Sequence, residues 1–279
     1  MDKRLVIFVV IVIFCILSIG AGVYQQFFYK YSDKDKLMLG KTETIVTEEK
    51  EEKVKDDFNN LFNNNVLYLT DAINSNAVRK DRNKDFIYTV NQYSKNVTGK
   101  YEMNINLPCI NVDSKTANEI NTNIEETFLP KANSILTTNV TTYTIYNIDY
   151  AGFITDDIAS LVIRATLKEG NNPQRVMIMT YNYNLATGNI VTLKDILDIK
   201  KITKETLQNK INKEITEISR KSADFQNLGY SVYTRNPNDK MYNVDNKETQ
   251  YFLGPDGYGY VLYAYGNKNN TSEVDVILF

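Results

Sequence analysis

Twenty tyrosines are the main resource for recognition chemistry in a chain that contains no histidine and no tryptophan. Tyr181 alternates with Tyr183, and Tyr263 alternates with Tyr265. Alternate residues of a β-strand share one face, so each pair is expected to form a small aromatic surface. Such a surface can stack on sugar rings or contact a protein. These four tyrosines are the candidate binding residues, with the alternative that they are half-buried tyrosines of an ordinary sheet.

Without histidine, neither a Ser-His-Asp triad nor a Cys-His pair can form within this chain, and a zinc hydrolase is disfavoured. No glycine-rich phosphate loop precedes a helix. Asn236, Asn238 and Asp239 resemble part of a calcium loop, but Lys240 and the missing Gly and Glu break the motif. We therefore predict no cofactor, no metal site and no enzymatic activity.

Carboxylate pairs are the remaining route to catalysis, because glycoside cleavage needs only two acids that flank a cleft. Asp156 and Asp157 are adjacent in the sequence, so in a strand they would face opposite sides. We interpret them as turn residues of a hairpin. A carboxylate-dependent cell-wall hydrolase stays as an alternative function.

The elements that would position these residues follow from hydrophobic periodicity. Residues 113–130 and 203–221 carry apolar side chains at helical spacing. Period-two patterns and turn residues predict strands in seven stretches: 85–93, 99–112, 141–153, 156–170, 174–188, 251–267 and 272–279. The order favours an α+β fold of antiparallel sheets with two main packed helices, not alternating βαβ units.

The stretch 181–197, "YNYNLATGNIVTLKDIL", contains the clearest local signals. Gly188 is expected in a turn that needs a positive φ. Thr192 and Asp195 have the spacing of a helix N-terminal cap. We interpret this stretch as strand, turn and helix start, in which only the tyrosines remain open to a binding role.

An apolar run, Leu5–Val23, precedes all of these elements. Its length suits a single membrane-spanning helix, and Lys3 and Arg4 place residues 1–4 in the cytoplasm by the positive-inside rule. We therefore expect a single-pass protein of the cell membrane whose bulk is extracytoplasmic. A cleaved signal peptide is the alternative.

Residues 24–57 are expected to be a charged linker, because most of this stretch, Lys30–Asp57, is charge-dense and poor in apolar side chains. Two α+β subdomains are predicted after it, at 58–150 and 151–279. The formal net charge of the chain is −2, so no electrostatic footprint for nucleic acid is present.

A family resemblance covers roughly residues 85–279. The stretch "YEMNINLPCINV" with the following "NEINTNIEETF" resembles the first of two linked, uncharacterised extracytoplasmic bacterial domains. The stretches 181–197 and 251–279 resemble the hallmark and the closing segment of the second domain. This pair forms the exported region of the lysozyme-binding anti-sigma-V factor and the N-terminal region of a peptidoglycan polysaccharide deacetylase. The chain departs from that pattern at 169–173, where it reads "EGNNP".

The resemblance implies binding or sensing at the bacterial cell envelope. Four cytoplasmic residues are too few to hold a sigma factor, and a chain without histidine lacks the groups for metal-dependent deacetylation. We expect a non-catalytic binding module that contacts peptidoglycan or a wall-directed protein such as lysozyme. A structural partner in a membrane complex is a further alternative to the hydrolase.

Overall fold

The computed structural model describes residues 62, 67–70, 77–138, 141–255 and 257–279. They belong to one compact unit, Lys55–Phe279. The predicted membrane segment Leu5–Val23 lies in the other unit, as does nearly all of the predicted linker. Both segments lie entirely outside the described residues. Within the described part of the chain, no helix is both long and apolar enough to cross a bilayer.

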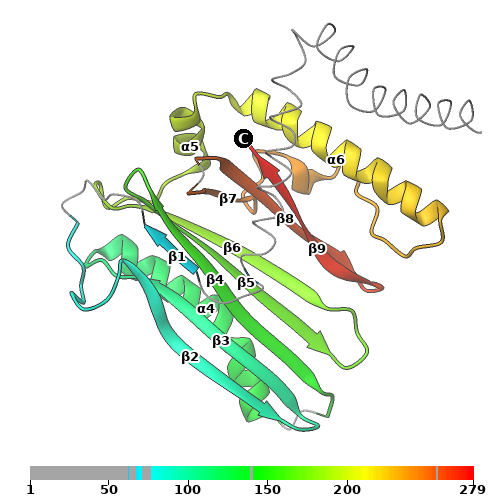
Figure 1. Ribbon diagram of the computed structural model, residues 1–279, viewed down its shortest axis with the longest axis horizontal. Helices are drawn as coiled ribbons and strands as arrows, with labels where there is room; N and C mark the ends of the chain where they lie inside the picture. Colours follow the sequence, from blue (N-terminus) through cyan, green and yellow to red (C-terminus); the bar gives the residue numbers. More distant parts are fainter. Residues whose placement is uncertain (1–61, 63–66, 71–76, 139–140, 256) are drawn as a thin grey trace, which may run out of the picture. The chain divides into compact units, whose positions relative to one another are not determined.

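The larger of two sheets has six strands. Five of them follow the order β2-β3-β4-β5-β6, and the short β1 pairs with the second half of β4 (Figure 1). The strands are β1 (Leu67–Thr70), β2 (Ile87–Val97), β3 (Tyr101–Ile110), β4 (Thr144–Thr155), β5 (Ile158–Glu169) and β6 (Arg175–Asn184).

This sheet is mixed, which corrects the expectation of purely antiparallel pairing. Both β1 and β3 run parallel to β4, while the remaining neighbours are antiparallel. The helix α4 (Lys115–Thr137) connects β3 to β4. A crossover of this kind returns the chain to the same end of the sheet, so the two strands must be parallel. The fold therefore contains one βαβ unit within an α+β arrangement.

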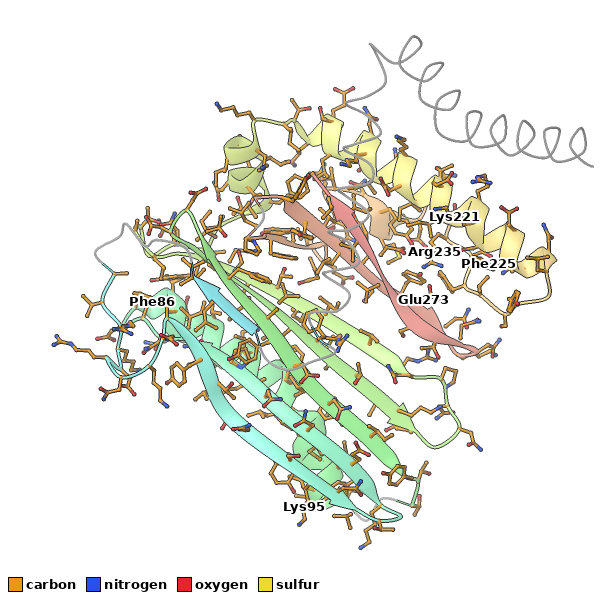
Figure 2. The ribbon with its side chains drawn as sticks, in the orientation of Figure 1. Phe86, Lys95, Lys221, Phe225, Arg235 and Glu273 are labelled. Carbon is orange, nitrogen blue, oxygen red and sulfur yellow. The ribbon has the colours of Figure 1, made fainter. Side chains whose placement is uncertain are left out.

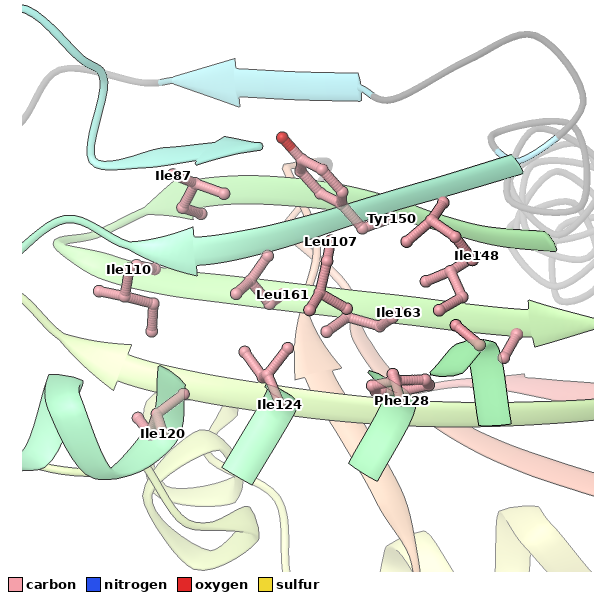
Figure 3. Packing of buried hydrophobic residues seen from close by; sticks show 14 of the residues in the cluster. Ile87, Leu107, Ile110, Ile120, Ile124, Phe128, Ile148, Tyr150, Leu161 and Ile163 are labelled. Atoms are coloured by element: carbon pink, nitrogen blue, oxygen red, sulfur yellow. The ribbon is translucent and has the colours of Figure 1, made fainter. Parts of the chain in front are cut away.

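The face of the large sheet that α4 covers forms the first hydrophobic core. Ile120, Ile124 and Phe128 point from the helix toward strand residues that include Leu107 and Ile163 (Figure 3). All five are at most 5% exposed. The helical spacing predicted for this segment is confirmed, although the helix begins after the Ser114 cap and continues through Pro130.

The smaller sheet has the order β7-β8-β9, and helices α5 and α6 contribute to its core. Leu207, Ile211 and Ile215 of α6 are fully buried in this second core, which confirms the predicted apolar face of that helix. These elements are α5 (Leu193–Lys200), α6 (Lys204–Asn227), the 3-10 turn η2 (Lys240–Tyr242), β7 (Gln250–Leu253), β8 (Gly259–Asn267) and β9 (Asn270–Leu278).

The two sheets contact one another on the face of the large sheet that α4 does not cover. Phe153 of β4 stacks on Phe252 of β7, with ring centroids 5.7 Å apart. Asn182 of β6 donates through Nδ2 to the Tyr251 carbonyl at 2.8 Å, and Thr180 Oγ1 accepts from the Tyr251 amide at 3.0 Å. The layers are therefore α4, large sheet, small sheet, and α5 with α6.

The predicted boundary between residues 150 and 151 falls inside β4. That strand spans Thr144–Thr155, and the sheet continues through β5 and β6 to Asn184. β4 pairs with β5 at twelve positions, so residues 58–150 by themselves lack the strands that complete their sheet.

Local turn signals of the sequence are confirmed. Asp156 and Asp157 have φ values of 50° and 60° and form the two-residue loop between β4 and β5, as a type I′ hairpin turn requires. Gly188 has a φ of 74°. Thr192 and Asp195 form a reciprocal capping box at the start of α5.

Candidate functional site

The structure separates the four candidate tyrosines into two places. Tyr183 is 1% exposed, and its hydroxyl lies 3.0 Å from the Ser114 hydroxyl at the N-terminal cap of α4. Tyr181 is half-buried and donates from its hydroxyl to Asn123 Oδ1 at 2.8 Å. Burial raises the pKa of Tyr181. Tyr183 supports the helix start, and Tyr181 alone of this pair reaches an exposed residue.

A shallow groove of about 790 Å³ follows the exposed face of α4 from its N-terminus. Asn123, the partner of Tyr181, is one of its lining residues. The others carry hydroxyl, amide or charged groups: Asp113, Ser114, Lys115, Asn118, Glu119, Thr122 and Glu126. Three of these lining residues are acidic and one is basic. We refer to this site as the α4 groove.

Tyr263 and Tyr265 lie elsewhere, in the small sheet, and are 4% and 6% exposed. The expected open tyrosine surface is therefore wrong for this pair, because α6 and the chain after it cover that face of β8. The ring of Tyr263 meets Tyr242 edge-on, with centroids 5.0 Å apart. Tyr265 meets Tyr233 at 4.8 Å.

Below these rings lies an ionic cluster built on Arg235, whose side chain is 7% exposed; of its two acidic partners Asp275 is 4% exposed and Glu273 is 46% exposed. Its Nη2 donates to Glu273 Oε2 at 2.7 Å and to Asp275 Oδ1 at 3.0 Å. Its Nη1 donates to Ser222 Oγ of α6 at 3.3 Å. Figure 2 shows Arg235 between the last turns of α6 and strand β9, which carries Glu273.

Tyrosine hydroxyls complete this Arg235 cluster. Tyr265 donates to Glu273 Oε2 at 2.8 Å, and Tyr242 donates to Asp275 Oδ2 at 3.3 Å. The guanidinium carbon of Arg235 lies 4.1 Å from the centroid of the Tyr265 ring, in cation–π contact. Tyr265 is thus a supporting residue of the cluster.

The electrostatics of the cluster are dominated by burial. Removal from water raises the pKa of Asp275 to about 6, although the Arg235 charge acts in the opposite direction. Burial likewise raises the pKa of Tyr242 and of Tyr263.

Arg235 was missed in the sequence because it sits in a loop and pairs with acids 38 and 40 residues further along the chain. One signal was available. Glu273 and Asp275 share a strand face with the buried Ile277, so two acids fall on a face that should be apolar. Buried carboxylates require a cationic partner.

No group of three or more potential metal-ligating side chains gathers in the described ranges. The expectation that no cofactor is used stays a prediction.

The fold is that of an α+β domain with two stacked sheets and outer helices. No family model matches the sequence, and no curated protein is similar to it. Among solved structures, the chain is similar to a DUF3298 family protein from Pseudomonas aeruginosa PAO1, with 11% sequence identity and a TM-score of 0.38. That similarity covers 75% of this chain and 91% of the other.

Proposed function

We propose that this chain is a membrane-anchored extracytoplasmic binding module of the bacterial cell envelope, and that it binds wall glycan in the α4 groove. The observation that carries the proposal is the contact of Tyr181 with Asn123, which joins the one accessible candidate tyrosine to a groove lined by polar side chains. The apolar run Leu5–Val23 and the family resemblance of the sequence support the location.

The chemistry of the groove suits a hydroxyl-rich ligand. Asn118, Thr122 and Asn123 are exposed and offer amide and hydroxyl groups that can both donate and accept hydrogen bonds. Glu119 and Glu126 add acceptors for sugar hydroxyls. Because these residues sit on one rigid helix whose opposite face is buried, their spacing does not depend on a loop.

A pull-down with insoluble peptidoglycan tests this proposal on the full chain in detergent micelles. We expect Asn118→Ala combined with Asn123→Ala to lower retention by roughly tenfold, as two lost charge-neutral hydrogen bonds imply. Asn133→Ala is the matched control, because Asn133 is an exposed residue of α4 outside the groove. Equal retention of the double variant and the control would refute glycan binding in the groove.

A basic wall-directed protein such as lysozyme is a second candidate ligand, since acidic residues outnumber basic ones in the groove. The same pull-down with immobilised lysozyme separates the two. The protein ligand would be favoured if the chain binds lysozyme but not peptidoglycan, and if the double substitution Glu119→Gln with Glu126→Gln weakens the binding to lysozyme.

The hydrolase alternative has one observation in its favour. Glu273 and Asp275 accept from the same Nη2 of Arg235 at 2.7 and 3.0 Å, so the two accepting oxygens are at most about 6 Å apart, an upper limit that includes the spacing of retaining glycosidases. Asp275 is only 4% exposed, which leaves a substrate no access to it. Release of soluble sugar from peptidoglycan by the full chain, abolished in Glu273→Gln, would establish the hydrolase instead.

A further inference from the structure

The apolar face of α6 continues beyond the core that it helps to form. Leu207, Ile211 and Ile215 are fully buried, and Ser222 further along the same face is 6% exposed. Phe225 follows Leu207 by five helical turns and therefore belongs to this face. Its side chain is nevertheless 52% exposed.

Two further apolar residues gather at this end of the helix. Leu228 is 74% exposed and Tyr230 is 62% exposed, and the Tyr230 ring meets Phe225 edge-on with centroids 6.0 Å apart. We refer to Phe225, Leu228 and Tyr230 as the aromatic tip. Figure 2 shows Phe225 at the far end of α6.

The segment that carries the tip is held firmly to the domain. Arg235 anchors it to β9 through the ionic cluster, and Ser219 Oγ of α6 donates to the Arg235 carbonyl at 2.8 Å. Gln226 Nε2 donates to the Val232 carbonyl at 2.9 Å. The exposure of three large apolar side chains is therefore a property of an ordered surface, and an exposed apolar cluster of this kind marks a site of interaction.

We propose that the aromatic tip contacts the interface of the bilayer that Leu5–Val23 spans. This inference rests on the membrane anchor of the proposed function. Tyr and Phe with Leu are the side chains that favour the boundary between lipid headgroups and acyl chains. Lys221, exposed one turn before Phe225, adds a positive charge suited to anionic headgroups.

Because the proposed anchor tethers the domain to the membrane, even a weak contact between the aromatic tip and the bilayer can orient the domain. A random coil of 34 residues, the number from 24 to 57, would span on the order of 30 Å on average, so an anchored domain behind a chain of that length would stay close to the membrane surface. Contact with the bilayer is then effectively intramolecular, and three partly inserted side chains can bias the orientation of the domain.

The geometry of the tip disfavours a sugar ligand. The Phe225 and Tyr230 rings are inclined at 85° and so share no common flat platform for a pyranose ring. The most exposed member, Leu228, has no ring to stack. The glycan site proposed above, the α4 groove, lies on a different helix, so the two sites can be tested separately.

Because the chain has no tryptophan, one substitution creates a unique fluorescent probe. Phe225→Trp in the full chain is reconstituted into vesicles of phosphatidylcholine and phosphatidylglycerol, with and without brominated acyl chains. Ile190→Trp is the matched control, since Ile190 is 55% exposed and lies between β6 and α5. We expect brominated lipid to quench the Phe225→Trp emission at least roughly twofold more than that of the control.

A second pair of substitutions tests whether the tip acts as a unit. Leu228→Ser with Tyr230→Ser in the Phe225→Trp background should remove most of the additional quenching while circular dichroism stays unchanged. Equal quenching of Phe225→Trp and Ile190→Trp overturns the contact with the bilayer, and so does quenching that the two serines leave unaltered.

The outcome also separates this inference from the proposed function. If alkaline carbonate extracts the chain from the vesicles, the membrane anchor is wrong and both proposals fail. If the chain is retained and binds peptidoglycan while Phe225→Trp is not quenched, only the contact of the tip with lipid fails. If the Phe225→Trp side chain is shielded from solvent in the absence of lipid, a protein partner covers the tip, and the inference is also overturned.

Discussion

Arg235 lies 3.0 Å from Asp275 in an ion pair whose side chains are 7% and 4% exposed. On α6, Arg220 also contacts two carboxylates, those of Glu217 and Asp224, but its own side chain is 64% exposed. The two arginines therefore have the same number of acidic partners and differ in burial. Burial decides how much each contributes to stability, because an unpaired charge is costly only where water cannot reach it.

Arg235→Ala should lower the free energy of unfolding by about 3–5 kcal/mol, since it leaves Asp275 buried without its cation. Arg220→Ala, the matched control, should change it far less, because water replaces the lost partner. Urea unfolding of the full chain in detergent micelles, followed by circular dichroism, measures both. Similar losses for the two variants would contradict a buried role for Arg235.

The pH dependence of stability should carry a signature of Asp275. Burial raises the pKa of this carboxyl to about 6 in the folded chain, above its ordinary value of about 3.9. The folded state therefore binds the proton more tightly, and the stabilisation is present below about pH 4 and is lost as the pH rises through about 6. Relative to Asp275→Asn, the wild type should lose on the order of 2–3 kcal/mol between pH 4 and pH 7. Parallel pH profiles of the two proteins would show that Asp275 is not protonated in this range.

Phe128 and Phe225 provide a matched comparison between core and surface. Phe128 is fully buried against the large sheet, so Phe128→Ala should cost about 3–5 kcal/mol through the cavity that it leaves. Phe225→Ala removes a 52% exposed ring and should cost less than about 1 kcal/mol. Urea unfolding checks both values. A large loss for Phe225→Ala would mean that the aromatic tip is part of the core and not a surface for binding.

The cap of α5 should behave as a reciprocal pair. Thr192 Oγ1 accepts from the Asp195 amide at 3.3 Å, and Asp195 Oδ2 accepts from the Thr192 amide at 2.7 Å. Thr192→Ala is expected to cost about 1 kcal/mol. A double-mutant cycle with Asp195→Ala should show that the two losses are not additive, because each substitution removes part of the same network. Additive losses would indicate two independent contacts.

Several local features of this protein could be predicted from the sequence alone. Alternation at Tyr101, Met103 and Ile105 predicts the buried face of β3, and helical spacing predicts the buried face of α6. The turn at Asp156–Asp157 and the cap at Thr192 follow equally from local chemistry. These features depend on neighbours within a few positions, where periodicity and turn propensity act directly.

The site was determined only by the tertiary structure. Period two places Tyr263 and Tyr265 on one face of a strand, but it does not say that α6 and the loop containing Arg235 cover that face. The parallel pairing of β3 with β4 likewise depends on the crossover through α4. Long-range packing selects which side chains reach solvent, and for that reason Phe225 is accessible while Tyr263 is not.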